Sequence, residues 1–496
     1  MGQQNSTGKK SAGQKNDNEK IDNLYQIFLK SAGVTTDSRN VPQGSIFFAL
    51  KGDNFDGNSF VAAALEAGAA YAVTDDPALF ESLCKKASSA SSSETFAIEQ
   101  NKNIAGENSF EEIVERLILT DDALITLQQL AAHHRRNLGI PIVALTGTNG
   151  KTTTKELITV VLSTEFNVAS TSGNLNNHIG VPLTILKMKS DTELGVVEMG
   201  ASAPGEIATL VAITDPDVAL ITNVGKAHLL GFGSFDGVKR AKGELYDYME
   251  KREGVVLYNH DNEHLCRMVA ERNLREAIPY GINYNEAEIL PLSEEKPLLR
   301  IRLKQGPIIS SILVGGYNAD NIMAAVAVGE YFGIAPELSA KAIGEYTPQN
   351  NRSQLIKRGG NTLIVDAYNA NPTSMRAALE NFASMELPCK NLILGDMLEL
   401  GDDSQSEHTA ILRLIATLSG IEKCLFVGSE FRKSYDAAKG EKEGLRIVLK
   451  DVSFFDNSSQ LHDFLTKERS SGKSFLIKGS RGTRLEAVLP AFPESV

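Results

Sequence analysis

The sequence predicts an α/β protein that is divided into three domains. The chain has 496 residues, and at roughly 100–200 residues per domain this length predicts two to four domains, each with its own core. Short apolar runs alternate along the chain with segments of helical period. Most of these runs are continuously apolar, which is typical of parallel strands that helices cover on both faces. We therefore expect a small N-terminal α/β domain, a central doubly wound domain and a C-terminal Rossmann-like α/β domain.

Composition and charge exclude several classes of protein. Hydrophobic residues make up 42% and charged residues 23% of the chain, and no apolar run approaches the roughly 20 residues that a bilayer span requires. A net charge of −12 is the wrong sign for a protein that holds nucleic acid by neutralising phosphates. The four cysteines form no C-x-x-C pair, and the polar N-terminus lacks the apolar core of a secretory signal. We expect a cytoplasmic protein with no nucleic-acid partner and no stable membrane association.

The first part of the chain combines a polar tail with a small domain. Residues 1–20 are polar throughout, and we expect them to be disordered. Residues 21–122 are assigned to the N-terminal domain. It is indicated by two apolar runs and one helical stretch, at residues 45–50, 70–74 and 60–67. A serine-rich segment from residue 87 offers little to bury, so residues 87–112 are interpreted as a polar insertion.

Two series of strands and helices follow. Residues 123–348 are assigned to the central domain, which opens with a helix of period near 3.6. Its expected strands lie at residues 142–145, 195–198, 218–222 and 255–258. Residues 349–496 are assigned to the C-terminal domain. Its expected strands lie at residues 362–366, 391–395, 424–427 and 474–478.

A glycine-rich loop between a buried strand and a helix is the strongest local signal. The spacing G-x-x-G-K-T from Gly147 to Thr152 is shorter than the usual G-x-x-x-x-G-K-[ST], yet it keeps the strand and helix context of a P-loop. Its glycines let backbone N–H groups turn toward phosphate oxygens, and Lys151 is expected against the terminal phosphates. The pattern predicts that the central domain binds a nucleotide. The candidate nucleotide-binding residues of this loop, which the resemblance described below assigns to ATP, are Gly147, Thr148, Asn149, Gly150, Lys151, Thr152 and Thr153.

Two further polar residues follow strands of the same domain. Glu198 ends one expected strand, and His228 follows another by a short loop. Since ligands collect at the carboxyl ends of parallel strands, these two residues and Thr152 could form a metal site beside a triphosphate. Taken singly, each side chain could equally be a surface or hydrogen-bonded group. The amide-rich loops at residues 173–180 and 366–372 could also be simple turns.

Many short motifs occur in order along the chain. They are T-D-S-R (36–39), A-L-K-G (49–52), F-D-G (55–57), T-G-T-N-G-K-T-T (146–153), N-L-N-N-H-I-G-V-P (174–182), E-M-G-A (198–201), I-T-N (221–223), A-H-L (227–229), G-F-G-S (231–234), A-K-G-E (241–244), D-A-Y-N-A-N-P (366–372), G-D-M-L-E-L-G (395–401) and K-G-S-R (478–481). With these motifs, the sequence resembles the Mur ligase family over most of its length.

The resemblance implies an ATP-dependent ligase of peptidoglycan precursor synthesis. The first domain would bind a UDP sugar, and the central domain would bind ATP. The C-terminal domain would close over ATP and admit the incoming amine. The dipeptide-adding branch implies that D-alanyl-D-alanine is joined to UDP-N-acetylmuramoyl-tripeptide through an acyl phosphate, with release of ADP and phosphate. ATP and Mg²⁺ are the implied cofactors, and we expect a monomer. Both ATP and the carboxylate are anionic, so cations must stabilise their encounter.

The resemblance also implies roles for individual residues. Lys151, Glu198, His228 and Lys242 would be catalytic. Thr152 and Glu198 resemble ligands of a first Mg²⁺, and His228 a ligand of a second, which Lys242 would hold after carbamylation. Asn318 and Asn321 match adenine-side asparagines, while Arg352 and Asp366 match residues that reach the nucleotide. The residues that resemble sugar-nucleotide contacts are Thr36, Ser38, Arg39, Asn174 and Asn177.

Three alternatives remain open at this level. A ligase of the same family that adds a single amino acid is disfavoured by Y-N-A-N-P at residues 368–372 and by the absence of an Asp-Asn-Pro-Arg motif. A folylpolyglutamate-type ligase is disfavoured by the sugar-nucleotide pattern of the first domain. A non-catalytic nucleotide sensor would be expected to lack Lys151, Glu198 or His228. The third residue of the substrate peptide, diaminopimelate or lysine, is not encoded in any motif that we identify.

Overall fold

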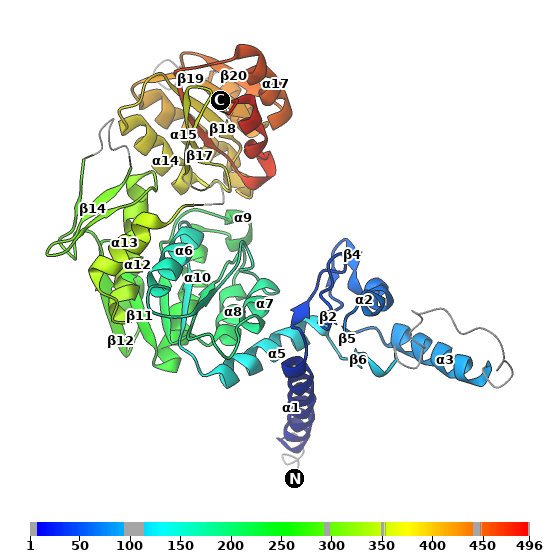
Figure 1. The fold of residues 1–496 in the computed structure, drawn as a ribbon. Coiled ribbons are helices and arrows are strands. Elements are labelled where there is room, and N and C mark those ends of the chain that lie inside the picture. Colours follow the sequence, from blue (N-terminus) through cyan, green and yellow to red (C-terminus); the bar gives the residue numbers. More distant parts are fainter. Residues whose placement is uncertain are drawn as a thin grey trace, which may run out of the picture. The chain divides into compact units, whose positions relative to one another are not determined.

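The computed structural model describes residues 7–93, 114–291, 298–348, 352, 354–439, 447 and 449–494, without the side chains of residues 7–17 and 87–93. The chain divides into two compact units, which are described separately. The first unit comprises Met1–Ile140, Thr171–Gly195 and Ala212–Asp215, and the second comprises Pro141–Ser170, Val196–Val211 and Pro216–Val496. Figure 1 shows that strands and helices alternate along both units.

The first unit contains a four-stranded parallel sheet in the order β1-β2-β5-β6. Its strands are β1 (Val34–Thr35), β2 (Ile46–Phe48), β5 (Tyr71–Thr74) and β6 (Leu117–Leu119), and a two-stranded hairpin is formed by β3 (Lys51–Gly52) and β4 (Phe55–Asp56). The helices are α1 (Thr7–Lys30), α2 (Val61–Glu66), α3 (Pro77–Ser93), α5 (Ala123–Leu138) and α7 (Gly180–Leu186). Apolar residues of β2, α2 and β5 form a common core.

The N-terminal segment differs from the predicted disordered tail. Helix α1 begins at Thr7, and only residues 1–6 of the expected tail lie outside the described residues. Leu24, Tyr25 and Phe28 near its C-terminus are buried, so packing of the last turns supports a helix that the polar first half would not support alone. The predicted insertion at 87–112 also begins in a helix, because α3 runs to Ser93, and residues 94–112 lie outside the described residues.

A buried histidine connects three segments of the first unit. The hydroxyl of Tyr25 lies 3.2 Å from His134 Nδ1, and His134 Nε2 lies 2.9 Å from the carbonyl oxygen of Met188. Burial lowers the pKa of His134 below its ordinary value, which favours the neutral ring in this position. These bonds fix α1 and the segment after α7 against α5.

The central sheet of six strands has the order β12-β11-β10-β7-β9-β8. The strands are β7 (Ile142–Thr146), β8 (Val168–Ser170), β9 (Leu194–Glu198), β10 (Val218–Ile221), β11 (Val255–Asn259) and β12 (Glu276–Tyr280). The strand order runs outward from β7 in both directions, which is the arrangement of a doubly wound sheet, and β10 pairs parallel with both β7 and β11. The carboxyl end of β7 therefore lies at a topological switch point, where such folds bind ligands.

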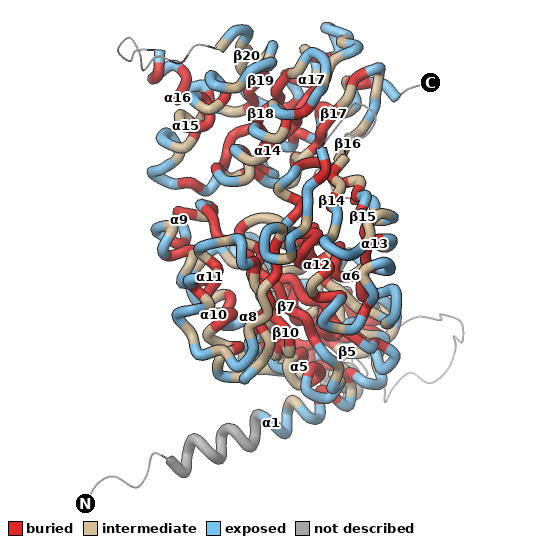
Figure 2. Tube along the Cα trace, turned by 90° about the vertical axis from the view of Figure 1, so that its left-hand side faces the viewer, coloured by how far each residue is buried: buried red, intermediate tan, exposed pale blue. Residues whose placement is uncertain are grey.

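Helices surround this sheet in the second unit. They are α6 (Lys151–Leu162), α8 (Glu206–Thr214), α9 (Leu229–Phe232), α10 (Phe235–Arg252), α11 (Glu263–Ala270), α12 (Ala319–Tyr331) and α13 (Pro336–Glu345). Figure 2 shows β7, β10 and α12 as buried. None of the helices in the described part of the chain combines the length and the apolar character needed to cross a membrane.

The C-terminal sheet also has six strands, in the order β16-β17-β21-β18-β19-β20. The strands are β16 (Gln354–Arg358), β17 (Asn361–Asp366), β18 (Lys390–Gly395), β19 (Ile421–Val427), β20 (Val452–Phe455) and β21 (Ser474–Lys478), and the flanking helices are α14 (Pro372–Ser384), α15 (Ser404–Thr417), α16 (Glu430–Lys439) and α17 (Ser458–Glu468). Strands β17, β18, β19, β20 and β21 pair in parallel. The predicted α/β fold class is confirmed in both large sheets.

Two antiparallel features were not expected from the sequence. Strand β16 forms a hairpin with β17, and β13 (Glu288–Ile289), β14 (Arg300–Arg302) and β15 (Ile308–Ser310) form a small separate sheet. Strands β13, β14 and β15 have two or three residues each, and β16 has five. Apolar runs of this length carry too little periodicity to distinguish a strand from a loop.

Candidate active site

The P-loop lies at the carboxyl end of β7 and leads directly into α6. All five residues of β7 are buried. Gly147 and Gly150 have φ values of 152° and 78°, which are unfavourable for residues with a side chain. A Cβ atom at Gly147 would also overlap the hydroxyl of Thr222. Glycine is therefore required at the first position of the loop by both conformation and space.

Two residues that follow β10 fix the shape of this loop. The hydroxyl of Thr222 donates to the carbonyl oxygen of Asn149 at 2.6 Å, and Asn223 Nδ2 donates to the same oxygen at 3.0 Å. Asn223 Oδ1 in turn accepts from the backbone N–H of Asn149 at 3.0 Å. Thr222 and Asn223 carried no predicted role, although their position after a parallel strand is where ligand-site residues are expected.

Lys151 is the first residue of α6, and its side chain folds back over the loop. Its Nζ donates to the carbonyl oxygens of Gly147 at 2.7 Å and Thr148 at 3.1 Å. Burial lowers the pKa of Lys151 to about 8, while the carboxylate of Glu198 acts in the opposite direction. At pH 7 the group therefore remains mainly protonated and supplies a positive charge beside the helix N-terminus, where anions are favoured.

Thr152 and Glu198 meet across the switch point. The hydroxyl of Thr152 donates to Glu198 Oε1 at 3.3 Å, and both residues are buried. A hydroxyl and a carboxylate are hard oxygen ligands of the kind that Mg²⁺ uses together with substrate phosphates. Among the residues that the structure describes, no three His, Cys, Asp or Glu side chains are grouped so as to hold a metal ion.

Lys242 lies on α10 and is only 2% exposed. Burial lowers its pKa to about 7, and the nearby charge of Lys151 acts in the same direction. Its Nζ lies 5.6 Å from the centroid of the Phe232 ring. A large part of Lys242 is therefore a neutral amine near pH 7, which is the form that reacts with carbon dioxide.

His228 precedes α9 in a left-handed backbone conformation with φ 49°. Its Nδ1 lies 2.5 Å from Glu399 Oε2. Burial lowers the pKa of His228, Glu399 opposes this effect, and Lys151 and Lys242 add to it. Glu399 belongs to the G-D-M-L-E-L-G motif but had no predicted role, because nothing in the sequence indicates that it would contact His228.

The loop that carries Glu399 is anchored at its base by a buried carboxylate. Asp396 Oδ2 accepts from the backbone N–H of Glu430 at 2.9 Å, and Asp396 Oδ1 accepts from that of Phe431 at 3.1 Å. These are the first N–H groups of α16, so Asp396 satisfies donors that the helix leaves unpaired. Ser480 adds a second anchor, because its hydroxyl accepts from the backbone N–H of Leu398 at 2.9 Å.

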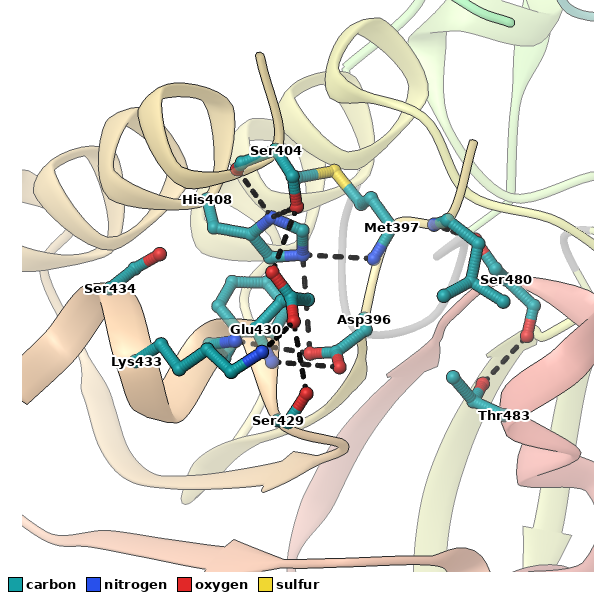
Figure 3. Close-up of polar contacts among 12 residues, drawn as sticks. Asp396, Met397, Ser404, His408, Ser429, Glu430, Lys433, Ser434, Ser480 and Thr483 are labelled. Atoms are coloured by element: carbon teal, nitrogen blue, oxygen red, sulfur yellow. Dashed lines mark hydrogen bonds and ion pairs between the residues drawn. The ribbon is translucent and has the colours of Figure 1, made fainter. Parts of the chain in front are cut away.

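His408 provides a third anchor for this loop. Figure 3 shows its imidazole between Ser404 and the backbone of Met397. The backbone N–H of Met397 donates to Nε2 at 3.0 Å, and Nδ1 lies 2.7 Å from the carbonyl oxygen of Ser404. Nε2 must therefore be unprotonated while Nδ1 donates, and the ring is neutral. Burial lowers the pKa of His408 in agreement with this arrangement.

The predicted adenine-side asparagines form a buried chain of side-chain hydrogen bonds. Asn318 Nδ2 donates to the carbonyl oxygen of Val314 at 2.8 Å, and Asn321 Nδ2 donates to Asn318 Oδ1 at 2.9 Å. Asn321 Oδ1 accepts from the hydroxyl of Thr154 at 3.0 Å. Asn321 also lies against Gly150. In the structure, these two asparagines hold α12 against the P-loop helix.

Arg352 and Asp366 lie near residues that precede α14. The guanidinium of Arg352 lies 3.6 Å from the centroid of the Tyr368 ring. Asp366 Oδ2 accepts from the buried Nζ of Lys478 at 2.5 Å. Asn371, at the N-terminus of the same helix, donates to Asn149 Oδ1 of the P-loop at 2.7 Å. The second unit thus brings the D-A-Y-N-A-N-P loop to the ATP-loop residue Asn149.

The predicted sugar-nucleotide residues all lie in the first unit. Arg39 forms a two-point ion pair with Asp37, with distances of 2.8 and 2.9 Å, whereas Thr36 and Ser38 are half-buried. Asn177 Oδ1 accepts from the backbone N–H groups of Ile179 and Gly180 at the start of α7. Asn174 is exposed in the loop before α7.

The last predicted residue of the P-loop, Thr153, is buried in α6 of the second unit.

Comparison with known proteins gives consistent matches along the chain. Three family models match: "Mur ligase family, catalytic domain" over residues 30–135, "Mur ligase middle domain" over residues 145–329, and "Mur ligase, glutamate ligase domain" over residues 351–481. The chain is 37% identical to UDP-N-acetylmuramoyl-tripeptide–D-alanyl-D-alanine ligase of Bacillus subtilis, covering 93% of both chains. It is 30% identical to the ligase of the same name from Escherichia coli, covering 93% of this chain and 94% of the relative.

Solved structures of MurF proteins are also similar to this chain over most of its length. A crystal structure of MurF from Acinetobacter baumannii is similar with a TM-score of 0.75 and 30% identity, covering 92% of each chain. MurF ligase from Thermotoga maritima, solved in complex with ADP, is similar with a TM-score of 0.73 and 25% identity, covering 94% of this chain and 97% of that one.

Proposed function

The chain belongs to the Mur ligase family, and from this premise we propose that it joins D-alanyl-D-alanine to UDP-N-acetylmuramoyl-tripeptide at the expense of ATP. The γ-phosphoryl group of ATP passes to the carboxylate of the tripeptide, and the amine of the dipeptide then displaces phosphate from this acyl phosphate. The products are the new amide, ADP and phosphate. This step belongs to peptidoglycan precursor synthesis.

The observation that carries the proposal is the arrangement at the end of β7. A glycine loop in a fixed shape, the cation of Lys151 and the Thr152–Glu198 pair lie together at the switch point of the central sheet. Phosphoryl transfer requires mainly positioning and electrostatic stabilisation. Backbone N–H groups at the start of α6 and Lys151 provide donors and charge for the phosphates.

Mg²⁺ is part of the proposal. Thr152 and Glu198 would hold one ion through oxygen atoms, and His228 with carbamylated Lys242 would hold a second. When bound, such ions would neutralise charge on the transferred phosphoryl group and on the attacked carboxylate. Within the protein, Lys242 supplies a neutral amine for carbamylation, and Glu399 holds Nδ1 of His228 so that Nε2 is directed away from that contact.

The remaining site residues are proposed to bind substrates. Thr36, Ser38, Arg39, Asn174 and Asn177 would contact the sugar nucleotide, and Asn318, Asn321, Arg352 and Asp366 would lie on the nucleotide side. Asn321 accepts a hydrogen bond from Thr154 of α6 and donates one to Asn318, and these bonds support an indirect role, in which the two asparagines hold the loop that binds ATP. We also propose a cytoplasmic monomer, in agreement with the four free cysteines.

One assay tests the reaction. The protein is incubated with ATP, Mg²⁺, UDP-N-acetylmuramoyl-tripeptide and D-alanyl-D-alanine, and phosphate release and product mass are measured. The expected result is one phosphate per amide formed and a product mass that equals both substrates minus water. Lys151→Met should reduce turnover by at least about 100-fold, because the phosphates lose their cation. Acceptance of a single amino acid in place of the dipeptide would overturn the substrate assignment.

A further inference from the structure

A small cavity of the second unit lies apart from the candidate active site. Its volume is about 220 Å³, and its lining comes from α12, the start of α13, the loop after β12 and the turn that joins β14 to β15. Figure 1 shows α12, α13 and β14 together in this part of the molecule. The lining contains none of the residues proposed to bind ATP, Mg²⁺ or the sugar nucleotide. The cavity is therefore separate from the proposed reaction.

Much of the cavity wall is apolar. Met323, Val326 and Ala327 come from α12, and Leu303 and Pro336 belong to the same lining. Met323 and Val326 are each only 2% exposed. Sites for drug-sized ligands usually measure about 300–1,000 Å³ and are lined mainly by apolar side chains. A cavity of this size and lining fits a smaller molecule with an apolar body.

One carboxylate of the wall has no cation beside it. Glu330 lines the cavity, and burial raises the pKa of its carboxyl above the ordinary value. Lys304 is the cation of the same lining, but its charge is paired with Glu286. Within the part of the chain that the structure describes, Glu330 forms no ion pair. A partly desolvated carboxylate without a counter-charge attracts a cation.

The cavity lies against the helix that also holds the P-loop helix. The four residues that α12 contributes, from Met323 to Glu330, have the spacing i, i+3, i+4, i+7, which places them on one face of the helix. Asn321 of α12 accepts from the hydroxyl of Thr154 in α6 at 3.0 Å. An occupant of the cavity and the P-loop helix would therefore contact α12 at different residues.

We propose that this cavity binds a small primary amine, with its apolar body against Met323 and Val326 and its ammonium group on Glu330. The charge of the unpaired carboxylate selects an amine, and the volume limits its size. The site goes beyond the proposed function and does not depend on it. Its occupant should bind equally well with and without a nucleotide.

Cyclohexylamine tests the site, because it joins an apolar ring to an ammonium group that is charged at pH 7.5. Cyclohexanol has the same ring without the charge. The full-length protein is labelled with ¹³C at the methyl groups of its nine methionines, and the Met323 signal is assigned with Met323→Leu. Cyclohexylamine should shift this signal with a Kd of about 1–10 mM, and cyclohexanol should bind about 10-fold more weakly. The signal of Met375, in the core of the C-terminal sheet, should not move.

Two variants separate the effect of charge from the effect of shape. Glu330→Gln should weaken binding of cyclohexylamine about 10-fold and leave binding of cyclohexanol unchanged. Glu337→Gln is the matched control, since Glu337 is exposed on α13 outside the lining, and it should behave as wild type. Saturating ADP should leave the Kd for cyclohexylamine unchanged.

Four results would overturn the proposed amine site. They are the absence of a saturable shift at Met323, equal affinities for the two probes, the same loss in both glutamate variants, and loss of binding in the presence of ADP. The last result would place the amine in the nucleotide site. None of these measurements uses the ligase reaction, so failure of the amine site and failure of the proposed function are distinguishable.

Discussion

Nδ1 of His228 and Oε2 of Glu399 lie 2.5 Å apart, although one residue follows the central sheet and the other follows the C-terminal sheet. An imidazole that is held through one ring nitrogen by a carboxylate has its other nitrogen in a fixed direction. Partners of this kind orient the histidine ligands of many metal sites. The contact therefore connects the position of Glu399 to the proposed role of His228.

Replacing Glu399 should weaken metal binding more than it weakens the fold. We expect Glu399→Ala to raise the free Mg²⁺ concentration needed for half-maximal turnover by roughly 10-fold, since such partners typically contribute 10–100-fold to metal affinity. Glu407→Ala is the matched control, because Glu407 forms an ion pair with Lys226 in the same region but does not contact His228. Turnover is measured at saturating substrates over a series of Mg²⁺ concentrations. Equal Mg²⁺ dependence of the two variants would contradict the orienting role.

Lys242 should carry a carbamate whose amount depends on pH. Its pKa is lowered from 10.5 to about 7, so the fraction of neutral amine rises as the pH increases from 6 to 8. Under a constant partial pressure of ¹³C-labelled carbon dioxide, NMR of the wild-type protein should show a carbamate carbon signal that grows over this range. Lys242→Ala should abolish the signal, whereas Lys239→Ala on the same helix should retain it. A signal that survives in Lys242→Ala would assign the modification to another amine.

Asn321 should contribute to folding even without a nucleotide. Asn321→Ala removes the acceptor of the Thr154 hydroxyl and the donor to Asn318. Because these groups are buried, we expect a loss of about 1–3 kcal/mol in the free energy of unfolding. Denaturant unfolding without ATP measures it, with the exposed Asn273→Ala as control. An unchanged unfolding free energy combined with a raised KM for ATP would show that Asn321 acts by direct contact with the nucleotide.

His408 should make the protein sensitive to acid. Its pKa in the folded state lies below the ordinary value of 6.5, so the unfolded state binds the proton more readily. Stability from the neutral ring is present above pH 6.5 and is lost as the pH falls toward the folded-state pKa. Between pH 7.5 and 5, the Tm of wild-type protein should fall more than that of His408→Gln, which keeps an acceptor but cannot titrate.

A second histidine serves as the control for this experiment. His462 lies on α17 and is partly exposed, so His462→Gln controls for the replacement of a histidine outside the loop of Met397. Parallel Tm curves for wild type and His408→Gln would mean that His408 is not responsible for the acid sensitivity.

The sequence predicted the parts of this protein that depend on local patterns. Continuous apolar runs identified β7, β9, β10 and β11, and the glycine spacing identified the loop before α6. The pairing of distant side chains was not predictable, because no local pattern relates His228 to Glu399 or Asp366 to Lys478. His408 was missed for a similar reason, since its function is to accept one backbone N–H from a loop that only the fold brings near.

The contacts that join the P-loop region to the C-terminal residues of the second unit are largely hydrophilic. Asn149 bonds to Asn371, His228 to Glu399, and Lys226 to Glu407. Hydrogen bonds and exposed ion pairs of this kind exchange for water at a net cost of only about 0.5–1.5 kcal/mol each. An enzyme that releases ADP, phosphate and a large product in every cycle benefits from hydrogen bonds and ion pairs that break and form again easily.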